Sequence, residues 1–216
     1  CWGRLDYSRV FFSSGADGLM RAAGWFYINY ATTYSAGNLD VYAASLNNAS
    51  DGRLEDNTAT GVIASDKNLD LSVDNSVTNY GWISGKGDVH FNVLKGTLYN
   101  RNAIAADNAL TINALNGVEN FKDIVAGTAL TIDTQKYVTN NSNSNMLGQT
   151  IAINAVNDIN NRGNIVGDYS LGVKTTGNIY NYLNMLSYGV AGVSANKVTN
   201  SRKDPDQRAN YGLALE

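Results

Sequence analysis

Apolar and polar residues alternate in short segments that recur from about residue 37 to residue 200. The segment Leu39–Ala43 has an apolar side chain at every second position. A period of two is typical of a β-strand with one buried face, so each such segment predicts a strand. Further segments with this alternation begin at Leu69, Val89, Leu110, Leu130, Ile151 and Leu171.

A second element follows each strand segment and reads as an aliphatic residue, any residue, and then asparagine. Beyond most of these asparagines another aliphatic residue appears, such as Ile104, and a small residue such as Gly127 closes the unit. Recurrence at a fixed period is the signature of a repeat architecture. The asparagines are 19 to 21 residues apart: Asn79, Asn100, Asn120, Asn140, Asn161, Asn181 and Asn200.

A unit of about twenty residues buries too little apolar surface to fold alone, so it needs a neighbour above and below. The pattern therefore predicts an all-β fold, a right-handed parallel β-helix (solenoid) of about seven to eight coils with asparagines aligned at one corner. Leucine-rich repeats have a similar period, but they need a denser leucine pattern and usually a helical back. The segments after each asparagine are too short and too rich in Asn and Gly for helices.

Three regions follow from the extent of the repeat. Residues 1–36 are rich in aromatic side chains and predict an N-terminal cap or divergent first coils, with an aromatic recognition surface as the alternative. Residues 37–200 form the β-helix, and residues 201–216 form a polar C-terminal linker. The polar stretch 49–60 interrupts the first coil and predicts a projecting loop, either a tolerated insertion or a binding element.

Charge and composition narrow the classes of partner. Charged residues make up 16% of the chain and the net charge is −3, so a broad basic face for nucleic acid is not expected. No apolar run is long enough to cross a bilayer and no signal peptide is present, so we expect a chain that is not embedded in a membrane. Cys1 and the terminal Leu215 and Glu216 suggest a monomeric fragment of a longer chain.

The best candidate for chemistry is an outward-facing column formed by Asp40, Asp70 and His90. Such a group suits metal binding or acid–base catalysis, as in a β-helical polysaccharide lyase or hydrolase. Thr111 and Thr131 follow in the same column, however, and no Lys or Arg is present there to stabilise a developing anion. Solvated charges on a strand face are the preferred interpretation, and we expect no enzyme activity, no metal and no cofactor.

The repeat resembles the filamentous haemagglutinin type, on the Leu-x-Ile, aliphatic-x-Asn and Ile segments quoted above. Such repeats form the β-helical shafts of two-partner-secreted bacterial exoproteins, including adhesins and contact-dependent growth inhibition toxins. The resemblance implies a secreted or cell-surface location. It covers about residues 37–200 and is more specific for the fold than for function.

Bulky residues near the corners distinguish this chain from a plain shaft of such repeats. Exposed aromatic rings on a rod are costly unless they meet a partner. The resemblance then implies a receptor-binding section that recognises an outer-membrane protein or lipopolysaccharide on a target bacterium; a plain structural shaft is the alternative. The candidate receptor contacts are Tyr80, Trp82, Tyr99, Tyr180 and Tyr182.

Overall fold

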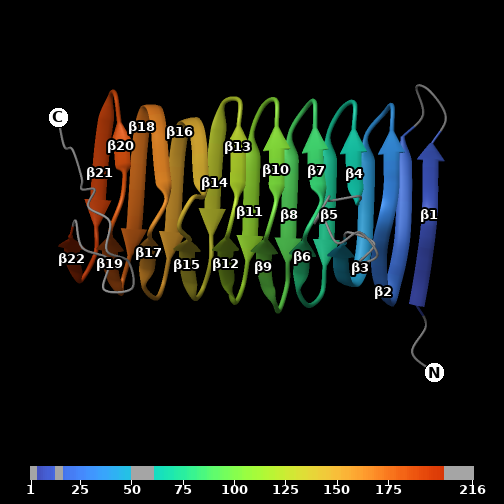
Figure 1. The fold of residues 1–216 in the computed structure, drawn as a ribbon, viewed down its shortest axis with the longest axis horizontal. Helices are drawn as coiled ribbons and strands as arrows, with labels where there is room; N and C mark the ends of the chain where they lie inside the picture. Colours follow the sequence, from blue (N-terminus) through green and yellow to red (C-terminus); the bar gives the residue numbers. More distant parts are fainter. Residues whose placement is uncertain (1–3, 13–16, 50–60, 202–216) are drawn as a thin grey trace.

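The chain winds into a parallel β-solenoid of about eight turns (Figure 1). The computed structural model describes residues 4–12, 17–49 and 61–201. Every strand pairing within these ranges is parallel, and a complete turn crosses three faces, here named A, B and C in chain order. The predicted all-β parallel solenoid is confirmed, whereas its right-handedness stays a prediction.

Short strands, each belonging to one turn, form most of the three faces. Face A contains β5 (Leu69–Val73), β8 (Val89–Val93), β11 (Leu110–Ala114), β14 (Ala129–Asp133) and β21 (Val190–Ser194). Face B contains β6 (Val77–Asn79), β9 (Thr97–Asn100), β12 (Gly117–Asn120), β15 (Tyr137–Asn140), β17 (Ile159–Asn161), β19 (Asn178–Asn181) and β22 (Lys197–Asn200). Face C contains β4 (Val62–Ser65), β7 (Trp82–Gly85), β10 (Ala103–Ala106), β13 (Asp123–Ala126) and β20 (Met185–Ser187).

Five longer strands bend around corners and so belong to more than one face. Strand β3 covers faces A and B, and β16 and β18 each run from face C into face A of the next turn. Strand β2 pairs along all three faces, and β1 pairs with its second half. Their bounds are β1 (Arg4–Phe12), β2 (Gly18–Ser35), β3 (Leu39–Asn48), β16 (Asn145–Ala155) and β18 (Asn164–Thr175).

The core consists of columns of like residues, because each strand aligns in register with its counterpart one turn away. On face A, Leu110 is the partner of Val89 on one side and Leu130 on the other. All three side chains are fully buried, as the period-two pattern predicted. The predicted column on face C is also buried: Ile83, Ile104, Ile124, Ile165 and Met185.

The corner between faces B and C, here called the B–C corner, contains a continuous ladder of asparagines, all buried except Asn200 at its end. In each step Nδ2 donates to Oδ1 of the next asparagine at 2.7 to 3.2 Å. The side-chain amides also donate to backbone carbonyls at the turn, as Asn79 does to Ala103 at 3.0 Å. The seven predicted asparagines therefore lie in one file, and Asn29 and Asn48 extend it by two further positions.

Residues 18–35, which lack the aliphatic-x-Asn signal, nevertheless form a turn of the same solenoid. Tyr27 occupies the interior position that an aliphatic residue fills elsewhere, and it is fully buried. Its hydroxyl hydrogen-bonds to Thr33, so the phenol is accommodated without an unsatisfied polar atom. Asn29 then takes the ladder position two residues later. A capping role for residues 1–36 stays a prediction, and residues 1–3 and 13–16 lie outside the described ranges.

The turn after Asn140 is longer than its neighbours. Asn143 has a φ of 60°, a left-handed conformation that asparagine tolerates better than most residues. The chain consequently reaches the interior of face C at Met146, six residues after Asn140 rather than four, and Met146 is fully buried. The predicted insertion at residues 49–60 lies outside the described residues except for Ala49. The predicted linker at 201–216 lies outside them except for Ser201.

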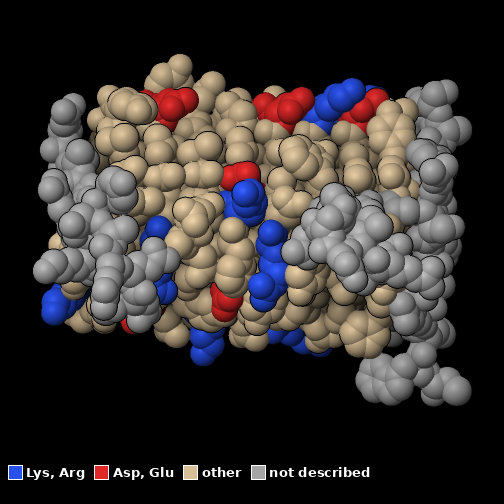
Figure 2. All heavy atoms as spheres, viewed as in Figure 1, with Lys and Arg blue, Asp and Glu red and all other residues tan. Residues whose placement is uncertain are grey.

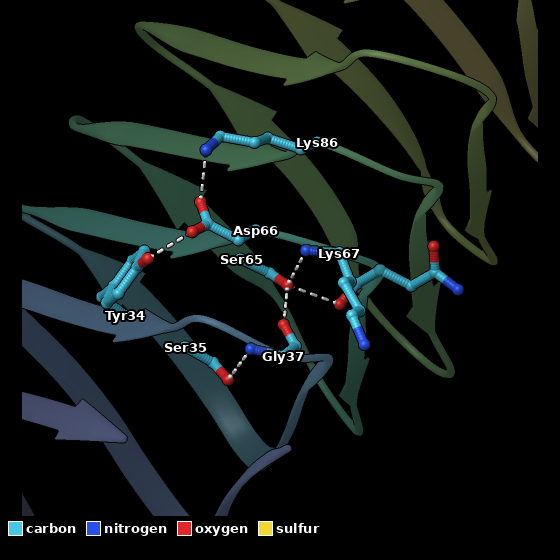
Figure 3. Close-up of polar contacts among 8 residues, drawn as sticks. Tyr34, Ser35, Gly37, Ser65, Asp66, Lys67 and Lys86 are labelled. Carbon is cyan, nitrogen blue, oxygen red and sulfur yellow. Dashed lines mark hydrogen bonds and ion pairs between the residues drawn. The ribbon is translucent and has the colours of Figure 1, made fainter. Parts of the chain in front are cut away.

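At the corner between faces C and A, here called the C–A corner, serine side chains hydrogen-bond the backbone in the turns that contain Ser35 and Ser65 (Figure 3). Ser65 Oγ donates to the carbonyls of Gly37 and Asn68 at 2.7 and 2.9 Å. Outside it, Asp66 accepts from the hydroxyl of Tyr34 at 2.5 Å and pairs with Lys86 Nζ at 2.8 Å (Figure 3). The hydrogen bond from Lys86, followed by that from Tyr34, lowers the pKa of Asp66.

Candidate functional site

Tyr80 and Trp82 project from the B–C corner because the chain turns sharply between them. Asn79 Oδ1 accepts a hydrogen bond from the backbone N–H of Gly81 at 3.1 Å, which fixes the turn. A Cβ at Gly81 would lie 1.9 Å from the carbonyl oxygen of Gly61, so only glycine fits there. The rings on either side point outward, with Tyr80 42% exposed and Trp82 49% exposed.

An arginine one turn further stacks on two rings of this aromatic surface. Arg101 follows its ladder asparagine as Tyr80 does, and its Cζ lies 5.6 Å from the centroid of the Tyr80 ring. The same guanidinium lies 4.5 Å from the Phe121 ring of the next turn. Cation–π contacts of this kind contribute about 0.5–1 kcal/mol at exposed sites. We call the set Tyr80, Trp82, Tyr99, Arg101 and Phe121 the aromatic corner.

The five predicted contact residues do not form one surface. Tyr99 is half-buried on β9, one turn from Tyr80. Tyr180 and Tyr182 lie four to five turns away, which corresponds to about 19–24 Å at the ~4.8 Å strand spacing. There Tyr182 packs against Arg162, whose Cζ is 5.5 Å from the ring centroid. The structure therefore resolves the predicted set into two separate clusters on the same corner.

Several exposed or stacking residues were missed by the sequence interpretation. Arg101, Phe121 and Arg162 all directly follow ladder asparagines, but the predicted contacts included only tyrosines and a tryptophan. Tyr169 and Tyr188 are 65% and 75% exposed at the C–A corner, more than any residue that the sequence singled out. Tyr169 lies two residues after Gly167 and Tyr188 directly precedes Gly189, so both are next to the small residues that close their units.

Charged side chains are dispersed over the described surface. On the face shown in Figure 2, blue and red side chains occur singly or in small mixed groups, with uncharged atoms between them. This distribution provides no continuous basic stripe for a phosphate backbone on that face. The candidate site consequently depends on aromatic rings and isolated cations.

The predicted outward column on face A does bring its histidine and one aspartate together. His90 Nδ1 lies 2.9 Å from Asp70 Oδ1, and both side chains are about half exposed. Asp40 is the strand partner of Asp70, and partial burial, together with the charges of Asp70 and Asp17, raises its pKa. The described residues include no cluster of three or more His, Cys, Asp or Glu side chains that could hold a metal ion. Nothing in the arrangement favours catalysis over a solvated ion pair.

The described residues contain no helix with the length and apolar character needed to cross a bilayer.

Comparison with known proteins found similarity to one family. The haemagglutinin repeat model matches residues 34–102, so this part of the solenoid is similar to filamentous haemagglutinin repeats. Such repeats occur in secreted and surface exoproteins and are typical of the generally non-catalytic structural segments of large adhesins. Searches of curated proteins and of solved structures found no match.

Proposed function

We propose that this chain is a non-enzymatic binding segment of a bacterial exoprotein that recognises an outer-membrane protein or lipopolysaccharide on a target cell. The contact would serve contact-dependent growth inhibition or adhesion. The observation that carries the proposal is the aromatic corner, where two half-exposed rings stand on a rigid turn beside a stacked arginine.

The aromatic corner is preorganised for binding. The turn at Gly81 and the cation–π contact of Arg101 hold the Tyr80 ring before any partner arrives. A partner therefore orders few side chains on binding, which reduces the entropic penalty of association. Aromatic residues and arginine are also the types most enriched at interface hot spots.

Binding of the purified, fluorescently labelled chain to intact Gram-negative cells tests the proposal. We expect saturable binding, and Tyr80→Ala combined with Trp82→Ala should weaken it at least about tenfold. The matched control, Tyr169→Ala with Tyr188→Ala, removes two exposed rings at another corner and should bind like the wild type. Equal binding by both double variants would refute the role of the aromatic corner.

The same assay addresses the alternative of a plain structural shaft. A shaft without a ligand predicts that wild-type binding does not saturate on any cell type. If binding saturates, protease-treated cells and cells with truncated lipopolysaccharide distinguish the two partner classes, because each treatment removes one of them.

A further inference from the structure

A second surface runs along the corner between faces A and B, here called the A–B corner. Two hollows of about 250 and 300 Å³ adjoin there and share the lining residues Asp133, Thr134 and Gln135. A third hollow, of about 580 Å³, shares Val156 and Thr176 with the second and continues onto face B. We call the three together the corner groove. It extends over five turns, about 19 Å from the first to the last.

The groove presents a polar side chain at every turn, although its chemistry changes along the rod and Asn154 Nδ2 already donates to Asp133 Oδ1 at 2.8 Å. The outward column on face A contains Asn92, Asn113, Asp133, Asn154 and Lys174. Within the described part of the chain, the side chains of Asn92 and Asn113 are exposed and make no hydrogen bond to another residue. Their amides can therefore both donate to and accept from a ligand.

The opposite edge of the groove is partly aliphatic. Leu94, Leu115 and Val156 line it and are 47%, 44% and 40% exposed, and Gln135 separates Leu115 from Val156. At Thr134 the floor is polar but already satisfied, since Thr134 Oγ1 donates to the Leu115 carbonyl at 3.4 Å and accepts from the N–H of Lys136 at 3.0 Å. The free amides of Asn92 and Asn113 thus line the same hollow as the apolar side chains of Leu94 and Leu115.

An aromatic ring lines the end of the groove on face B. Tyr137 borders the third hollow and its hydroxyl donates to Glu119 Oε1 at 2.6 Å. The ring lies over Gly117, where an added Cβ would be 3.1 Å from two ring carbons. Gly117 also has a φ of 126°, which other residues rarely adopt. The ring is therefore held in a defined orientation.

These features exclude three classes of ligand in turn. A peptide that adds to a sheet needs a free strand edge, but the strands at the groove are paired on both sides. A polyanion needs several cations, and the hollows contain one, Lys174, against Asp133 and Asp158. A lipid tail needs a continuous apolar channel, which the amide column interrupts.

We propose that the corner groove binds a neutral, linear polysaccharide lying along the solenoid axis. Sugar hydroxyls donate and accept hydrogen bonds, as the free amides of Asn92 and Asn113 do. The C–H surfaces of sugar rings match the aliphatic edge and the face of Tyr137. A polymer lying along the rod also reaches two equivalent free amides, those of Asn92 and Asn113, which are one turn or ~4.8 Å apart. This site is independent of the aromatic corner and of the function proposed for it.

Titration of the purified chain with neutral linear oligosaccharides of two to six units tests the inference, using glucose-, mannose- and N-acetylglucosamine-based series. Calorimetry should show affinity for at least one series that rises with length. Asn113→Ala and Tyr137→Ala should each weaken binding of the longest member about tenfold. Asn108→Ala, which removes an exposed asparagine at the C–A corner, is the matched control and should leave the affinity unchanged.

Three results would overturn the inference: no binding in any series, binding that Asn113→Ala leaves intact, or preference for a sulfated polymer over every neutral one. Asn113 contacts no partner side chain through a hydrogen bond in the described structure, so its variant should fold even if Tyr137→Ala does not. The Tyr80→Ala and Trp82→Ala variant should retain full sugar affinity. Failure of one proposal is thus distinguishable from failure of the other.

Discussion

Replacing Asn120 by alanine removes one complete step of the buried ladder. Asn120 Nδ2 donates to Asn140 Oδ1 at 2.9 Å and to the carbonyls of Lys122 and Asn145 at 3.1 and 3.0 Å. Its Oδ1 accepts from Asn100 Nδ2 at 2.9 Å and from the N–H of Lys122 at 3.3 Å. The side chain is fully buried, so water cannot replace these partners without opening the corner.

The expected loss follows from these contacts. The amide nitrogen has two protons for its three acceptors, so the side chain makes about four full hydrogen bonds. Asn100 Nδ2 still reaches two carbonyls, and Asn140 Oδ1 still accepts from Ser144 Oγ, so those two groups keep partners. A net contribution of about 0.5–1.5 kcal/mol per hydrogen bond predicts a decrease of about 2–6 kcal/mol in the free energy of unfolding. Urea unfolding followed by circular dichroism measures that decrease directly.

A neighbouring threonine provides the control for this substitution. Thr139→Ala lies on β15, beside the ladder, and should lower the free energy of unfolding by about 1 kcal/mol or less. If Asn120→Ala destabilises the chain no more than Thr139→Ala does, the ladder is not a principal stabilising element and the reasoning is refuted.

Three further substitutions give independent tests. Asn120→Asp places a carboxylate against Asn140 Oδ1 and two carbonyls, which should raise the pKa of the new side chain in the folded state. The variant should then be most stable at low pH and lose stability as pH rises above about 4. A stability profile that does not change with pH would contradict this. Phe91→Ala leaves a cavity in the face A column and should reduce the free energy of unfolding by about 3–5 kcal/mol, whereas a loss below 1 kcal/mol would mean that the column repacks. Burial, followed by the hydrogen bond to Glu119, raises the pKa of Tyr137 to about 12, so its stabilising effect is present below pH 10 and is lost as pH rises toward 12. Ultraviolet titration should show that Tyr137→Phe removes a phenol that ionises near pH 12, and an unchanged curve in that range would contradict the assignment.

The repeat columns could be predicted from the sequence because stacking places equivalent positions in contact. Leu110 and Ile112 follow the same alternation as every other strand on face A, so one aligned pattern determined their burial. The asparagine file was predictable for the same reason. Tyr27 escaped detection because an aromatic residue with a hydroxyl partner replaced the expected aliphatic one.

The candidate sites were less predictable, because they depend on spacing between turns and on individual rotamers. Tyr80 and Tyr182 occupy equivalent positions after ladder asparagines, yet five intervening steps separate them along the rod. The stacking of Arg101 on two rings requires side-chain directions that alternation does not encode. The corner groove similarly depends on how the ring of Tyr137 lies over Gly117.

Site-specific photocrosslinking on intact target cells tests the proposed receptor contact most directly. A photoreactive phenylalanine derivative at position 82 replaces Trp82 on the aromatic corner, and the same group at position 188 replaces the more exposed Tyr188 elsewhere. The account predicts a discrete adduct with an outer-membrane component from position 82 only, which excess unlabelled wild-type chain abolishes. No adduct from position 82, or equal adducts from both positions, would contradict it.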